Sequence, residues 1–200
     1  MKPPRNRLAV AAAALAFLLA LALPAFVSGY GIRILNLALI SAIAVIGLNF
    51  AFGYAGLITL AQAGFVGCGA YLTAILSTAA GLPPLVSIPL AVLGTVIVAV
   101  AVGLPMLRLK GHYLALATLG FNVSFVIVAT NWKSVMGGTD GISGIPSLAV
   151  PGFAFATDHR YFYVLWLALA AATWIAWRIR YSHIGLAMIA VRDDEIATGA

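Results

Sequence analysis

The sequence is short of charged residues. Asp, Glu, Lys and Arg make up 8% of its 200 residues and hydrophobic residues 64%, whereas soluble domains carry about 25% charge. This composition excludes an ordinary soluble domain and predicts an integral membrane protein. Basic residues outnumber acidic ones by 11 to 5. No basic stretch alternates with aromatic residues, so the excess indicates cytoplasmic loops rather than nucleic-acid binding.

Cysteine and histidine are also scarce. The single Cys68 excludes an internal disulfide and a multi-cysteine metal site. The three histidines, His112, His159 and His183, match no metal-ligand spacing. The apolar runs contain no paired carboxylates and no nucleophile beside a base, so we expect neither an enzyme nor a metal or cofactor in this chain.

Acidic residues are absent from every long apolar run. Ion-coupled carriers place ionisable groups at membrane depth, so a proton-driven carrier is disfavoured. The glycine-rich run at Gly137 to Pro146 lacks the Gly-Lys-Ser/Thr ending of a phosphate-binding loop, and we expect a flexible external turn there. Any ATP would therefore be bound by a separate subunit.

Apolar runs predict an all-α, polytopic protein with about six transmembrane helices, because about 20 apolar residues cross a bilayer as a helix. The expected spans are residues 8–28, 34–52, 57–80, 85–107, 112–130 and 161–177, with residues 131–160 as an external loop. The first run has the shape of a signal peptide, but its small-residue cleavage site is poorly formed, so we expect a retained helix.

The basic residues predict that both ends are cytoplasmic. Arg33, Lys133 and Arg160 then face outward. The other eight basic residues lie inside, as the positive-inside rule requires: Lys2, Arg5, Arg7, Arg108, Lys110, Arg178, Arg180 and Arg192.

Two sets of residues within the spans carry specific expectations. The small residues Ala63, Gly67, Ala70 and Ala74 share one helical face, which predicts close packing against another helix. The uncharged polar residues Asn49, Gln62, Thr118 and Asn122 lie near mid-span. They either line a substrate path or bond one helix to another, and both readings stay open.

Residues 178–200 form the one long stretch that could not lie inside a bilayer, and they include three of the five acidic residues. A helix over Ser182 to Val191 would place Ile184, Met188 and Val191 on one narrow apolar stripe. Such a helix either lies at the lipid headgroups or docks on a partner.

Four motifs carry a family resemblance. The pattern RxRxSxIGxAxxAxRxxEIA is matched at Arg178, Arg180, Ser182, Ile184, Gly185, Ala187, Ala190, Arg192, Glu195, Ile196 and Ala197. The other three are GLNFAFGYAGLITLAQAGFVGCGAYLTAIL at 47–76, LRLKGHYLALATLGF at 107–121 and GGTDGISGIP at 137–146. Together they resemble motifs of the inner-membrane permeases of bacterial ABC importers for branched-chain amino acids.

The resemblance implies a permease subunit in the bacterial inner membrane. Its partners would be a second permease subunit, ATP-binding ATPase subunits and a periplasmic substrate-binding protein. The cytoplasmic segment would couple to the ATPase through Arg180, Ser182, Ile184, Gly185, Met188, Val191, Arg192, Asp194 and Glu195. The alternatives are a permease for urea or short amides, and a truncated fragment without transport activity, since such permeases usually continue through further spans.

Overall fold

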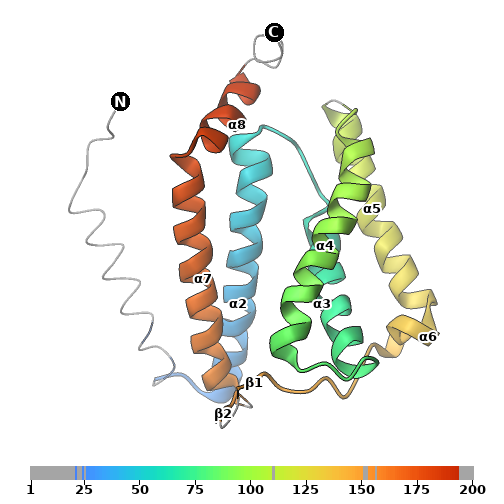
Figure 1. The fold of residues 1–200 in the computed structure, drawn as a ribbon, viewed down its shortest axis with the longest axis vertical. Coiled ribbons are helices and arrows are strands. Elements are labelled where there is room, and N and C mark those ends of the chain that lie inside the picture. Colours follow the sequence, from blue (N-terminus) through green and yellow to red (C-terminus); the bar gives the residue numbers. More distant parts are fainter. Residues whose placement is uncertain are drawn as a thin grey trace.

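The computed structural model describes residues 21, 24, 26–109, 111–150, 153–155 and 157–193 (Figure 1). Its elements in chain order are α2 (Gly29–Asn49), the π-helix η2 (Phe50–Tyr54), α3 (Gln62–Thr78), α4 (Pro84–Met106), α5 (His112–Asn131), α6 (Lys133–Met136), the 3-10 helix η3 (Gly138–Asp140), β1 (Ala149–Val150), β2 (Phe153–Ala154), α7 (Asp158–Arg180) and α8 (His183–Asp193). The all-α prediction is confirmed apart from the short β1–β2 pair. The predicted span 8–28 lies almost wholly outside the described residues.

Four of the described helical segments are long and apolar enough to cross a membrane: Gly29–Tyr54, Pro84–Met106, His112–Asn131 and Asp158–Arg180. A helix satisfies its backbone groups internally, which the hydrocarbon core demands. At most 17% of the most apolar window of any of these segments is buried inside the chain. These helices therefore present most of their apolar surface outward, to lipid or to other subunits.

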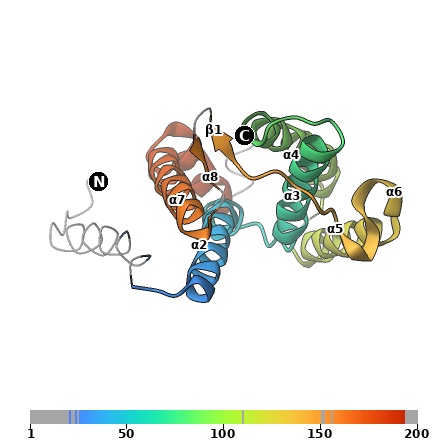
Figure 2. The ribbon, with the colours of Figure 1, turned by 90° about the horizontal axis from the view of Figure 1, so that it is seen from below.

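The helices form two groups, α2 with α7 and α3 with α4 and α5 (Figures 1 and 2). In the first group, Ile32 and Phe162 are fully buried, and Asn36 Nδ2 donates to the carbonyl of Asp158 at 3.0 Å. In the second group, the buried hydroxyls of Ser77 and Ser87 lie 2.8 Å apart and link α3 to α4. Pairing of α2 with α7 brings together segments that are remote in the sequence.

The two ends of the bundle differ. At the end called here the α8 end, α2, α4 and α7 finish, α5 begins and α8 crosses over α2 and α7 (Figure 1). At the opposite end, the hairpin end, β1 pairs antiparallel with β2. The turn from α3 to α4 also lies there; Gly81 takes a positive φ of 63°, and Pro84 occupies the first turn of α4, where its missing N–H costs no helical bond.

The third predicted span is shorter as a helix than expected. The prediction was 57–80, whereas α3 has 17 residues, Gln62–Thr78, about 25 Å against a hydrocarbon thickness of about 30 Å. Gly56, at φ 69°, turns the chain out of helical geometry, and residues 57–61 are not helical. Two of their backbone amides bond side-chain hydroxyls instead: Leu60 N to Thr118 Oγ1 and Ala61 N to Thr59 Oγ1.

Two other predicted spans are longer in the structure, and the predicted external loop contains short regular elements. The second predicted span, 34–52, begins at Gly29 and continues through η2 to Tyr54, and the sixth, 161–177, widens to Asp158–Arg180. The predicted loop 131–160 contains α6, η3 and the β1–β2 pair. The C-terminal helix predicted over Ser182 to Val191 is present as α8.

Candidate functional site

The polar residue Thr118 on α5 lies against the start of α3. Its hydroxyl accepts a hydrogen bond from Leu60 N at 3.0 Å and donates one to the carbonyl of Ala115 at 3.0 Å. The side chain is buried. Thr118 thus satisfies a backbone donor that the non-helical residues 57–61 would otherwise leave unpaired at membrane depth.

Gln62 and Asn122 gather at the same place. Gln62 Nε2 donates to the carbonyl of Ala44 at 2.9 Å and ties the first turn of α3 to α2. A Cβ placed on Gly64, also in that first turn, would lie 3.4 Å from Asn122 Oδ1 on α5. We call Gln62, Thr118 and Asn122 the polar cluster; the structure brings these three predicted path residues together where α2, α3 and α5 approach. Residues 34–107, which supply the α2 and α3 sides, contain no charged residue.

Asn49, the fourth predicted path residue, lies elsewhere, at the C-terminal end of α2. A Cβ on Gly53 would overlap Asn49 Oδ1, so the amide of Asn49 covers that glycine. Arg192 of α8 reaches the same glycine, because its Nη1 donates to the Gly53 carbonyl at 2.6 Å. A predicted path residue and a predicted coupling residue therefore meet at Gly53.

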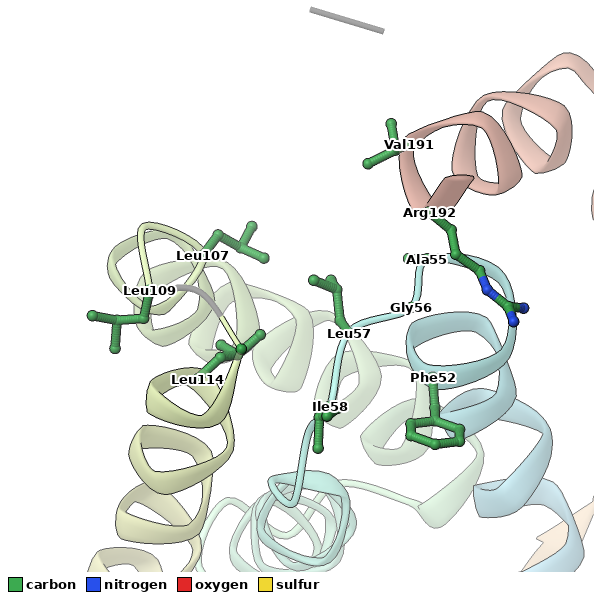
Figure 3. A pocket seen from close by; sticks show the side chains of 11 residues that line it. Phe52, Ala55, Gly56, Leu57, Ile58, Leu107, Leu109, Leu114, Val191 and Arg192 are labelled. Atoms are coloured by element: carbon green, nitrogen blue, oxygen red, sulfur yellow. The ribbon is translucent and has the colours of Figure 1, made fainter. Parts of the chain in front are cut away.

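A cavity of about 540 Å³ lies beside this contact at the α8 end (Figure 3). Its lining comes from the end of α2, the α2–α3 connection, the α4–α5 turn and α8: Phe52, Ala55, Gly56, Leu57, Ile58, Leu107, Leu109, Gly111, Leu114, Val191 and Arg192. Among the lining residues that the structure describes, Arg192 is the one cation and the others are apolar. Figure 3 shows its side chain directed toward the end of α2. The cavity opens beside residues 57 and 58, which lead into the polar cluster.

Sequence reasoning had singled out only Val191 and Arg192 among the residues that line this cavity. The leucines and Ile58 resemble any other apolar residue of a span. Gly56 carried a signal, since a glycine within a Gly-Tyr-Ala-Gly run at the end of a span indicates a turn.

Three predicted coupling residues build the corner between α7 and α8. Ser182 Oγ donates to the Ile179 carbonyl at 2.7 Å and accepts from Gly185 N at 3.4 Å, which caps the first turn of α8. A Cβ on Gly185 would lie 2.8 Å from the carbonyl oxygen of Arg180, so only glycine allows this approach. The Arg180 guanidinium lies 5.7 Å from the ring centroid of Tyr181.

The predicted apolar stripe of α8 is accessible in part. Ile184 is 67% exposed, Val191 is 42% exposed and lines the cavity, and Met188 is half-buried. Leu186 is 59% exposed and adds apolar surface outside the stripe. Asp194 and Glu195 lie outside the described residues.

Only part of the small face of α3 packs against other residues of this chain. A Cβ on Gly67 would overlap the ring of Phe125 on α5, and Ala74 is buried. Ala63 and Ala70 are exposed in this chain, so their packing against another helix stays a prediction. Gly64, which lies beside this small face, makes a second close approach, since its Cβ would lie 2.8 Å from the ring of Phe121.

Comparison with known proteins identifies the family of the chain. Residues 30–200 match the family model for the branched-chain amino acid transport system permease component. The high-affinity branched-chain amino acid transport system permease protein LivM of Salmonella typhimurium (strain LT2) is 32% identical over 90% of this chain and 48% of its own length. The LivM protein of Escherichia coli (strain K12) is 33% identical over the same shares. The chain spans about half the length of these curated relatives.

No solved structure matches the chain significantly. The family match extends over more than half of the chain and includes the polar cluster, the α2–α3 connection and α8. The chain therefore belongs to the family of permease components of branched-chain amino acid transport systems.

Proposed function

We propose that the protein is the permease subunit of a bacterial ABC importer that moves branched-chain amino acids across the inner membrane. The observation that carries this proposal is the family match over nearly the whole of the described bundle. The chain itself binds no ATP in this proposal. Energy comes from separate ATPase subunits, while a second permease subunit and a periplasmic substrate-binding protein complete the assembly.

The test is uptake by cells or proteoliposomes that contain the protein with these partner subunits. Labelled leucine, isoleucine and valine are expected to accumulate only when ATP is supplied, and unlabelled branched-chain amino acids are expected to compete. Urea and acetamide serve as matched competitors of the alternative substrate class. Competition by these amides without competition by leucine would overturn the proposed substrate.

We further propose that the α8 end faces the cytoplasm and that this chain forms about six spans, with its first and last residues on the cytoplasmic side. Four of the described basic residues support this orientation, since Arg108, Arg178, Arg180 and Arg192 lie at the α8 end. A cysteine at position 186 on α8 is expected to react with a membrane-impermeant thiol reagent only in inside-out vesicles. Labelling in intact spheroplasts would contradict the orientation.

In this proposal the polar cluster and Asn49 border the substrate path. Uncharged polar groups suit a zwitterionic amino acid, because they solvate both of its charges without binding it irreversibly. The competing reading is that these residues only bond helix to helix, as Gln62 does with the Ala44 carbonyl. Cysteine replacements at 49, 62, 118 and 122 separate the two: a path predicts labelling by a water-soluble thiol reagent that substrate slows, whereas purely structural residues stay unlabelled with and without substrate.

We also propose that the exposed apolar surface of α8 docks on the ATPase. Apolar anchors carry most of the affinity in helix-in-groove contacts, and charges at the rim contribute little. Met188→Asp is expected to abolish capture of the ATPase and substrate-stimulated hydrolysis, while the spans stay folded. Retained capture and retained stimulation in Met188→Asp would contradict docking and favour a helix that lies at the lipid headgroups.

A further inference from the structure

Arg192 joins α8 to the connection between α2 and α3. Its hydrogen bond to the Gly53 carbonyl spans 139 residues of sequence. Gly53 lies in η2, at the end of the α2 helix, where the last carbonyls have no helical N–H partner further along the chain. A cation is the favoured partner for such carbonyls, because the helix C-terminus carries partial negative charge.

The aliphatic part of Arg192 makes a second contact three residues further on. A Cβ on Gly56 would lie 2.9 Å from Arg192 Cγ. Gly56 has φ 69°, a conformation in which other residues are strained. Arg192 thus holds this turn at two points, by a hydrogen bond on one side and by its hydrocarbon stem on the other.

The turn at Gly56 begins the non-helical residues 57–61, whose far end is held by Thr118. Hydrogen bonds therefore hold the connection near both ends: Arg192 of α8 bonds Gly53 just before it, and Thr118 of α5 bonds Leu60 near its end. Residues 57–61 are themselves not helical; at their two ends the Leu57 amide donates to the Ala51 carbonyl at 2.9 Å and the Ala61 carbonyl accepts from Phe65 N at 3.1 Å. This segment is the shortest route along the chain from Gly53 and Gly56 to the first turn of α3, where Gln62 lies.

We propose that Arg192 is a positioning residue that makes α8 and the α2–α3 connection move together, so that a shift of α8 reaches the polar cluster. The inference rests on the proposed function, because the partner that shifts α8 is the ATPase. It differs from the expectation that Arg192 couples by docking directly on the ATPase. Ile184 and Leu186 remain exposed on α8 and are free to take that docking role.

The contact is tested by a stability cycle on the purified protein, which requires no transport. In Gly56→Ala the new Cβ is strained at this positive φ and also overlaps Arg192. In an Arg192→Ala background the overlap is removed and only the backbone strain remains. The loss of Tm caused by Gly56→Ala is therefore expected to be smaller in that background. Gly81→Ala is the matched control, since Gly81 has φ 63° and nothing within 4 Å of its Cβ position, so its effect is expected to be the same in both backgrounds. Equal losses of Tm from Gly56→Ala in the two backgrounds would show that Arg192 does not contact Gly56.

The role is tested in the assembled transporter. Arg192→Ala is expected to lower leucine uptake per ATP hydrolysed about fivefold, the factor that matches one hydrogen bond of about 1 kcal/mol. Capture of the ATPase is expected to stay unchanged, and Arg192→Lys, which keeps a cationic donor, is expected to recover part of the loss. Arg108→Ala removes a charge at the same end and serves as the control.

Three outcomes overturn the proposal. Unchanged uptake per ATP in Arg192→Ala shows that the contact transmits nothing. A parallel loss of ATPase capture and uptake shows that Arg192 docks instead. An equal effect of Arg108→Ala shows that only net charge matters. If the unmodified protein transports no branched-chain amino acid, the proposed function fails, and the stability cycle still decides whether Arg192 holds the connection.

Discussion

Thr118→Val is expected to destabilise the bundle because it leaves the Leu60 amide without its partner. Valine keeps nearly the same shape as threonine, so packing around this buried site changes little. The substitution removes the hydroxyl that accepts from Leu60 N at 3.0 Å. No helical carbonyl can replace it, since residues 57–61 are not helical.

The magnitude follows from two limits. A buried donor left unpaired costs about 1–3 kcal/mol, while hydrogen bonds between membrane helices average about 0.6 kcal/mol with a maximum near about 1.7 kcal/mol. A backbone amide inside the bilayer has few alternative partners, so we expect about 1–2 kcal/mol for Thr118→Val. The expected effect is in the lower part of the range for a buried donor, because Leu60 itself is half-exposed in this chain.

The matched control is Thr130→Val on the same helix. The Thr130 hydroxyl donates only to carbonyls of its own helix, those of Val126 at 2.9 Å and Ile127 at 3.1 Å. Its removal leaves no backbone donor unpaired, so the expected change is below about 0.5 kcal/mol. Both variants are compared by detergent-denaturation midpoints, together with hydrogen exchange at the Leu60 amide.

Only Thr118→Val is expected to accelerate exchange at Leu60. If Thr118→Val and Thr130→Val lower stability equally and exchange at Leu60 is unchanged, the reasoning about the α3 start is wrong.

Gly67→Leu is expected to destabilise the protein by more than about 2 kcal/mol through overpacking against the ring of Phe125. Gly103→Leu is the control and is expected to be tolerated, because nothing lies within 4 Å of its Cβ position. Thermal stability and uptake are measured for both variants, and equal effects would contradict the close approach at Gly67. Ser77→Ala and Ser87→Ala each remove the hydrogen bond between the two hydroxyls, although the Ser87 hydroxyl keeps the Pro84 carbonyl at 3.3 Å as a partner, so the double variant is expected to lose less than the sum by about 0.6 kcal/mol or more. Additive losses in that cycle would show that the two hydroxyls do not stabilise each other.

Much of the fold was readable because membrane helices are specified locally. An apolar run of sufficient length must be helical in lipid, so the existence of the segments Gly29–Tyr54, Pro84–Met106, His112–Asn131 and Asp158–Arg180 followed from composition. The error at 57–61 has a physical origin. Hydropathy averages over a window and does not register one glycine with positive φ, nor a distant hydroxyl that replaces a helical hydrogen bond.

The sequence indicated the polar residues of the candidate site by their type, but not how they are arranged in space. Polar residues near mid-span attract attention because lipid solvates them poorly, which identified Gln62, Thr118 and Asn122. Their assembly depends on α3 starting late and on α5 lying beside it. Asn49 was grouped with them in the sequence, yet it lies at Gly53, because the last turn of α2 faces α8 rather than α5.

The sequence by itself determined a helical membrane protein, four long apolar helices, the family motifs and a polar, amphipathic C-terminal segment, since each depends on local composition and spacing. Only the tertiary structure decided that α2 pairs with α7, that Phe125 of α5 is the partner of Gly67, and that Arg192 holds Gly53. These contacts join residues that are far apart along the chain. The outward faces of the spans are almost uniformly apolar, so no hydrophobic pattern could select one partner over another, and shape together with a few hydrogen bonds made the choice.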